Sequence, residues 1–274
     1  MRKVSGKTFY WIAITLATVI ILAPFYISAV YSFKTKREIA LTGVALPSKL
    51  HFENYAEAMR VSNFLNAFKN SLIVTVCTVT MVILMCSMAS YVISRENSRF
   101  YNGIYYIFLA AIMLPFQVIM LPLYANLNNL GLMNTLTGMI LTMIGLSIPY
   151  TVFLYSGFIK TVPKSMEEAA YVDGAGKFTT FWKVVFPLMK PINFTVLIIT
   201  ALSTWNNFMV PLIIAQKEEV RTLPLSQFYF FGEHSVDLNL AFATFTLSML
   251  PIIILYLIMQ KYIISGITAG AVKG

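Results

Sequence analysis

Few side chains in this 274-residue chain have the type and spacing that catalysis or metal binding requires. Cys77 and Cys86 stand nine residues apart in one apolar stretch. At 3.6 residues per turn they lie on opposite faces of a helix, so they share neither a disulfide nor a metal. His51 and His234 stand in polar segments without the ligand spacing of a metal site. We therefore expect no catalytic residue, no metal and no cofactor.

One glycine-containing segment has a faint likeness to a phosphate-binding loop. Residues 173–177 contain two glycines and a lysine, but the first glycine of that pattern is missing. Phe178 also occupies the position where a Ser or Thr would bind magnesium. We therefore expect that the chain itself binds no ATP. A membrane enzyme is also disfavoured, because no carboxylate pair, His cluster or Ser/His set stands at the end of an apolar stretch.

The polar groups best suited to recognising a ligand are neutral. Gln117 lies between two prolines, and Trp205, Asn206 and Asn207 follow one another in a later apolar stretch. Amides exchange hydrogen bonds with hydroxyls, and a sugar face can lie on an indole ring, so these groups favour a neutral polyhydroxyl ligand. In the alternative interpretation the amides bond between helices and Trp205 packs in a core. The sequence leaves both open.

The elements that must position these groups are apolar helices. The chain is 58% hydrophobic and 11% charged, which is too little charge for a soluble globular protein. Its net charge of +9 is scattered between apolar stretches, which disfavours nucleic-acid binding. We predict an all-α integral membrane protein with a single domain, residues 1–274. Charge-free runs long enough to cross a ~30 Å hydrocarbon core predict six spans, at residues 8–33, 70–94, 100–125, 136–159, 191–216 and 238–260.

Six spans put both termini on one side of the membrane. Twelve of the 20 Lys and Arg residues fall on that side, many of them in the loop 160–190, so we predict that this side is the cytoplasm. Lys34, Lys36 and Arg37 are exceptions, because they stand close to a membrane end on the opposite side. No acidic or basic residue falls inside a predicted span. Ion-driven carriers usually keep such groups there, which disfavours a self-sufficient channel or carrier.

The loop 160–190 has the most structured polar sequence. Ser165 and Glu168 predict a capping box at the start of a short helix. Gly174 and Gly176 predict that left-handed residues end it, and an aromatic segment then leads to Pro187. Two alanines in the short helix permit close approach of a partner surface. The alternative is an amphipathic helix that lies on the bilayer.

This loop resembles the cytoplasmic loop of bacterial ABC importer permeases, known by its Glu-Ala-Ala...Gly...Pro pattern. Val184 and Phe186 stand where that family more often has Ile and Leu. In the family the short helix docks into a cleft on the ATPase subunit and carries its motion to the membrane helices. The resemblance implies the type I importer fold, with 160–190 as a cytoplasmic coupling loop. It assigns ATPase coupling to Glu168, Ala169, Ala170, Asp173, Gly174 and Pro187.

Further stretches resemble carbohydrate importers. Residues 205–208 look like their Trp-Asn-x-Phe segment, and residues 260–274 look like the end of the second permease of maltose-type systems. The resemblance implies a permease that carries a sugar or oligosaccharide across the bacterial plasma membrane, with a pathway lined by Trp205, Asn206, Asn207 and Gln117. It implies a heterodimer with a sister permease, two ATP-binding subunits, an extracytoplasmic sugar-binding protein and membrane lipid as partners. The alternative is an ABC permease for amino acids or peptides.

Overall fold

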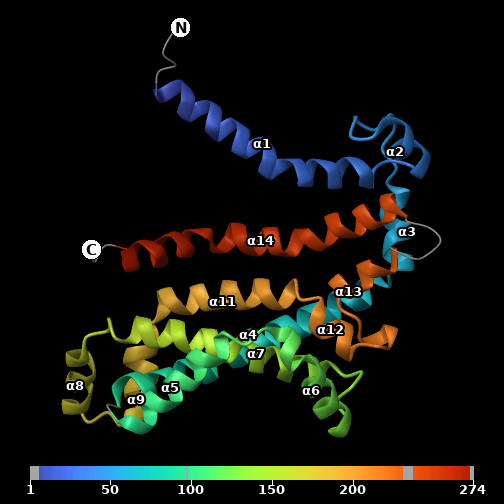
Figure 1. Cartoon of the computed structure of the whole chain (residues 1–274). Coiled ribbons are helices and arrows are strands. Elements are labelled where there is room, and N and C mark those ends of the chain that lie inside the picture. Colours follow the sequence, from blue (N-terminus) through green and yellow to red (C-terminus); the bar gives the residue numbers. More distant parts are fainter. Residues whose placement is uncertain (1–5, 97, 231–236, 272–274) are drawn as a thin grey trace. The chain divides into compact units, whose positions relative to one another are not determined.

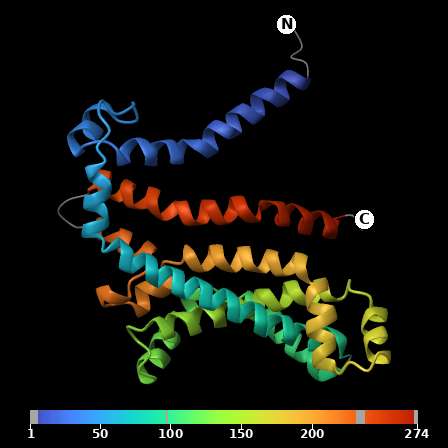
Figure 2. The ribbon, with the colours of Figure 1, turned by 180° about the vertical axis from the view of Figure 1, so that it is seen from behind.

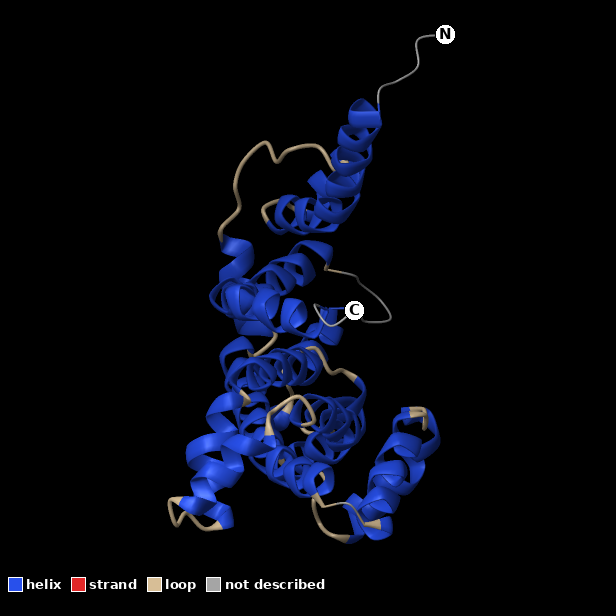
Figure 3. Cartoon of the chain, turned by 90° about the vertical axis from the view of Figure 1, so that its left-hand side faces the viewer, coloured by secondary structure: helices blue, strands red, loops and turns tan. Residues whose placement is uncertain are grey.

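The computed structural model describes residues 6–96, 98–230 and 237–271. Throughout these residues it consists of helices and connecting loops without a strand, which confirms the all-α prediction (Figure 3). The chain divides into two compact units. Unit 1 comprises Met1–Leu65 and Ser226–Pro251, and unit 2 comprises Asn66–Leu225 and Ile252–Gly274. His234 lies outside the described residues, as do Arg2, Lys3 and Lys273, three of the twelve basic residues counted on the predicted cytoplasmic side.

Unit 1 joins the first helices of the chain to the beginning of the last one. Its helical elements are α1 (Gly6–Ser32), α2 (Lys36–Thr42), α3 (Glu53–Val61), η3 (Phe228–Phe230) and the first part of α14 (Leu238–Ala271). Small side chains let these helices approach closely, since the buried cluster consists of Ala58, Phe230, Ala241 and Ala243. The last helix therefore packs in unit 1 through its N-terminal turns.

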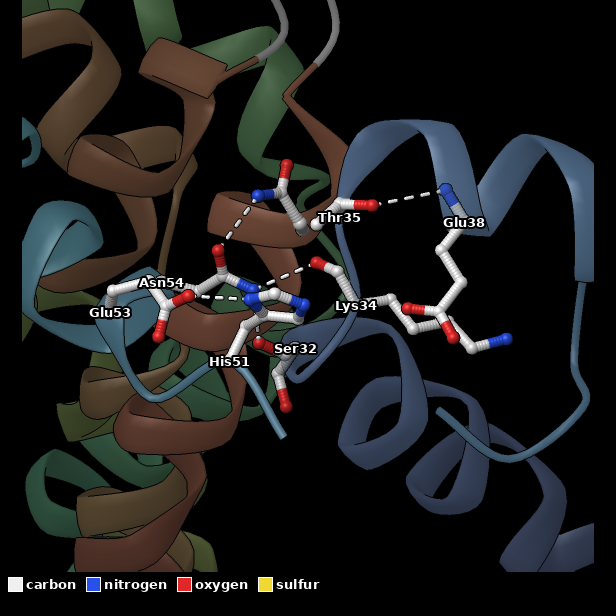
Figure 4. Close-up of polar contacts among 8 residues, drawn as sticks. Ser32, Lys34, Thr35, Glu38, His51, Glu53 and Asn54 are labelled. Carbon is white, nitrogen blue, oxygen red and sulfur yellow. Dashed lines mark hydrogen bonds and ion pairs between the residues drawn. The ribbon is translucent and has the colours of Figure 1, made fainter. Parts of the chain in front are cut away.

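Two of the three cations that stand near a predicted membrane end are satisfied within unit 1. The Lys34 side chain is fully buried, and its Nζ donates to Thr42 Oγ1 at 2.8 Å and to the carbonyl oxygen of Gly43 at 2.7 Å. Figure 4 shows this lysine among polar side chains that include Ser32, Glu38 and Asn54. Lys36 forms an ion pair with Asp237. Lys34 and Lys36 thus have partners within unit 1, and the orientation of the chain stays a prediction.

Unit 2 contains the helices of the predicted spans in the middle of the chain (Figure 1). They are α4 (Phe64–Arg95, beginning in unit 1), α5 (Arg99–Ile112), α6 (Phe116–Asn129), α7 (Leu136–Ile159), α11 (Lys190–Trp205) and α12 (Met209–Ile214). α5 and α11 pack against α7. A buried cluster that includes Val82, Val152 and Tyr155 holds α4 and α7 together. The bounds of α7 are the same as those of the predicted span 136–159.

Four described helices are long and apolar enough to cross a membrane: Phe9–Ser32, Phe64–Arg95, Leu136–Ile159 and Leu238–Ile258. Two bent pairs bring the number to six if each pair is one span. The predicted span 100–125 is not one straight helix, because α5 and α6 meet at 104°. Pro115 caps α6 there, and a proline disfavours helical geometry in the residue before it.

The predicted span 191–216 is also interrupted. α11 ends at Trp205, and α12 begins only at Met209. Before α11 the chain turns a corner of 76° between Lys177–Leu188 and Lys190–Trp205, which Figure 2 shows in gold and orange. Trp205 therefore lies at the end of a helix and not in the middle of one.

Candidate coupling helix and polar helix break

The short helix predicted in the loop 160–190 is α8, Lys164–Val172. The predicted capping box is wrong: Pro163 occupies the N-cap position, no side chain caps the helix, and Ser165 lies inside the first turn. Pro163 has extended backbone angles, with φ −61° and ψ 128°, so it stands outside the helix and Lys164 is the first helical residue. The helix therefore begins earlier than the capping pattern predicted.

The end of α8 agrees with the prediction for Gly174. Its φ is +83°, and its N–H donates to the Tyr171 carbonyl at 3.0 Å, while the Ala175 N–H donates to the Ala170 carbonyl at 2.9 Å. This pair of bonds is a Schellman motif, which needs a left-handed residue at the glycine position. Gly176 does not share this role, because it has extended backbone angles and caps the next helix.

α8 has one buried and one exposed face. Glu167 and Ala170 are buried, whereas Glu168 and Ala169 are exposed. Val172, on the exposed side, keeps 86% of its surface accessible. The exposed face thus presents a carboxylate, a small side chain and an apolar side chain, together with the exposed Asp173 that follows the helix.

The aromatic segment after α8 is helical throughout. It consists of α9 (Lys177–Thr180), a π-helical turn (Phe181–Val185) and α10 (Phe186–Leu188), in which Pro187 is exposed. The Trp182 and Phe186 rings pack at a tilt of 54°, with ring centroids 4.8 Å apart. The π-turn inserts one residue into the helical repeat, which sequence periodicity did not predict.

Sequence analysis missed two residues that hold α8. The Arg95 guanidinium lies 2.7 Å from Glu167 Oε1, and the Tyr91 hydroxyl donates to Glu167 Oε2 at 2.8 Å. Both residues belong to the last turns of α4. Beside them lies a groove of about 560 Å³, bounded by α4, α5, α8 and α9. The sequence signals for this contact were Arg95, at the end of the predicted span 70–94, and the carboxylates Glu167 and Glu168, after the predicted span 136–159.

The predicted pathway residues fall into two places. Trp205 is 5% exposed and packs edge-on against Phe68, with ring centroids 5.8 Å apart. Asn206 is exposed at the end of α11, and Asn207 accepts a hydrogen bond from the Val210 N–H at 2.9 Å. These three residues therefore share the break between α11 and α12. Gln117 is exposed in the first turn of α6, a helix that packs against α12.

Residues 81–269, which include α8 and both helix breaks, match the family described as the binding-protein-dependent transport system inner membrane component. The chain belongs to this family. It is 36% identical to the probable starch degradation products transport system permease protein AmyC of Thermoanaerobacterium thermosulfurigenes, and the similarity covers 100% of both chains. It is 39% identical to the multiple sugar-binding transport system permease protein MsmG of Streptococcus mutans, again over 100% of both.

A third relative is the melibiose/raffinose/stachyose import permease protein MelC of Bacillus subtilis, which is 36% identical over 92% of this chain and 91% of its own. Among solved structures, a chain of a bacterial ABC transporter involved in the import of the acidic polysaccharide alginate superposes with a TM-score of 0.82. That match covers 96% of this chain and 99% of the other at 21% identity, so the two chains share a fold. The protein is thus a membrane-embedded permease with the fold of an ABC importer subunit.

Proposed function

We propose that this chain is one of two permease subunits of an ATP-driven importer that carries a sugar or oligosaccharide into the bacterial cell. The proposal depends on one observation above all: relatives named for sugar transport are 36–39% identical over the full chain. These names favour sugars over the alternative, amino acids or peptides. The neutral amides and indole at the α11–α12 break are also suited to a neutral ligand with many hydroxyls.

The energy is supplied by separate ATP-binding subunits, and α8 receives it on the cytoplasmic side. The support is physical: the face of α8 that carries Glu168 and Ala169 is exposed, and the Ala169 methyl group permits a partner surface to approach the backbone. Ala170 lies on the opposite, buried face and packs α8 onto its own chain. Asp173 and Gly174 end α8, and Pro187 lies in the helical segment Lys177–Leu188 that leads on to α11.

The sugar passes the break between α11 and α12. Asn206 is the residue there with an exposed amide, so it is the one placed to exchange hydrogen bonds with hydroxyls. Asn207 contributes by holding the first turn of α12, and Trp205 supports the break by packing on Phe68. Gln117 lies on α6, which packs against α12, and adds a second exposed amide.

An uptake experiment tests the proposal. The chain is co-expressed with its sister permease, ATPase and binding protein, and proteoliposomes are offered labelled maltotriose, raffinose or arabinotriose. We expect ATP-dependent uptake of at least one of the three sugars, and no uptake without the binding protein. Uptake of amino acids or peptides but of no sugar would contradict the substrate class.

The coupling role has its own test. Ala169→Trp should reduce copurification of the ATPase by at least about tenfold, which corresponds to ~1.4 kcal/mol. The matched control is Ala40→Trp, since Ala40 is an exposed alanine in α2, a short helix of unit 1. Equal copurification of both variants with the ATPase would remove α8 from the contact.

A further inference from the structure

The first turn of α8 carries a buried carboxylate, that of Glu167. A helix that only presents an exposed face to a partner does not need a buried charge. Glu167 is 5% exposed, and both of its oxygens have partners on α4. Arg95 Nε donates to Oε1 at 2.7 Å, and Tyr91 Oη donates to Oε2 at 2.8 Å. A buried charge is costly unless it is paired and hydrogen-bonded, so this carboxylate holds α8 to α4 in one position.

The same two residues of α4 also reach the segments on either side of α8. Arg95 Nη2 donates to the Val162 carbonyl at 2.8 Å, in the loop between α7 and α8. The Tyr91 ring lies 5.2 Å from the Phe181 ring, in the helical arm that follows α8. The loop before α8, α8 itself and the arm after it therefore all contact the last turns of α4.

We infer that Arg95, Tyr91 and Glu167 form a clamp that sets the rotation of α8 and transmits its movement to α4. The inference rests on the proposed coupling role of α8. A helix of nine residues has little stability of its own, so contacts with its surroundings decide how it lies. Neighbouring residues are about 100° apart around a helix, so burying Glu167 also turns Glu168 and Ala169 outward.

The chemistry of the clamp suits transmission better than an apolar contact would. An apolar contact is non-directional and permits sliding, whereas charge-assisted hydrogen bonds have fixed directions. The planar guanidinium binds the carboxylate and the Val162 carbonyl together, which a lysine ammonium does not reproduce. α4 then continues as one helix of 32 residues, so a displacement of its end reaches the whole span. These are positioning residues, because the exposed face of α8 meets the ATPase.

A charge-swap experiment tests the clamp in the assembled complex. Arg95→Glu, Glu167→Arg and the double swap are compared by the number of sugar molecules imported per ATP hydrolysed, using whichever of maltotriose, raffinose or arabinotriose is transported. We expect each single swap to lower this ratio about tenfold or more and the double swap to recover part of it, because the swap restores the ion pair but not the hydrogen bond to the Val162 carbonyl. Arg99→Gln, a change to an exposed cation in the next helix, should leave the ratio unchanged.

Softer variants keep the test decisive if a swapped chain fails to assemble. Tyr91→Phe retains the ring contact with Phe181 and removes the hydroxyl, which hydrogen-bonds to Glu167 and to Tyr171 of α8, and Arg95→Lys retains the charge. The clamp predicts a lowered ratio for both in complexes that contain normal amounts of ATPase. A ratio equal to wild type in both would overturn it and leave Arg95–Glu167 as a stabilising pair. In the same preparations, an Ala169→Cys cross-link to the ATPase reports whether α8 contacts the ATPase. A cross-link together with a wild-type ratio overturns the clamp alone, whereas no cross-link overturns the proposed coupling role itself.

Discussion

The substitution of Gly174 by valine tests the end of α8. Gly174 has a φ of +83° and closes the Schellman motif with two backbone hydrogen bonds. A Cβ added at this position meets no atom within 4 Å. The cost of the substitution within the chain is therefore backbone strain and not a clash.

The magnitude follows from that strain. A residue with a side chain in the left-handed region costs roughly 1–2 kcal/mol, and a β-branched side chain belongs at the upper end of this range. The equilibrium in question is between the observed turn at the end of α8 and a conformation in which that turn is open. A cost of one to two kcal/mol shifts this equilibrium by a factor of about 5–30. Asn tolerates the left-handed conformation best, so the expected order of damage is Gly174→Val, then Gly174→Ala, then Gly174→Asn.

The assay is ATPase copurification and ATP-dependent sugar uptake for the three variants, with the melting temperature of the isolated permease measured in detergent. We expect copurification and uptake to fall in that order while the melting temperature changes little, because no other described contact of the membrane helices depends on Gly174. Equal losses for Asn and Val would refute the strain argument and point to a partner that excludes any side chain at this position.

Three further predictions concern other parts of the chain. Lys34→Met should lower the melting temperature of the permease, because it removes two hydrogen bonds, to the Thr42 hydroxyl and the Gly43 carbonyl, each of which contributes about 0.5–1.5 kcal/mol; an unchanged melting temperature would contradict the buried role of Lys34. Asn206→Ala should raise the KM for sugar without loss of assembly, whereas Trp205→Ala should impair assembly or stability as a core truncation of about 3–5 kcal/mol does; the reverse pattern would make Trp205 the sugar contact. In a cysteine-free chain, a cysteine at position 164 should react with a membrane-impermeant maleimide only in inverted vesicles, and reaction in intact cells would reverse the topology.

The membrane helices could be predicted because absence of charge over about twenty residues is a strong local signal. The limits of α7 agree with the charge-free run 136–159, and the end of α8 agrees with Gly174. The bend between α5 and α6 and the break after Trp205 were not predicted. The bend between α5 and α6 lies in apolar sequence, and the asparagines after Trp205 carry no charge, so a search for charge-free runs passes over both places. Pro115 was visible, but prolines also occur inside described helices, as Pro149 does in α7.

The clamp on α8 was beyond sequence reasoning for a different reason. Glu167 and Glu168 are adjacent and chemically identical, and only tertiary packing decides which of them is buried against Arg95. The capping pattern predicted that Glu168 caps the start of the helix together with Ser165. In the structure the helix starts earlier, directly after Pro163, so Glu168 has no capping role. Lys34 was likewise interpreted through its charge, although its burial is decided by the loop that folds over it.

The most direct test of the central claim is a cross-link between α8 and the ATPase. The chain with Cys77 and Cys86 replaced and with Ala169→Cys is assembled into the complex, and ATPase subunits carrying single surface cysteines are screened for disulfide formation. We predict a cross-link from position 169 that blocks ATP-driven sugar uptake until it is reduced, and none from the control Ala40→Cys. A complex that imports sugar but forms its ATPase cross-link from position 40 and not from 169 would contradict the account.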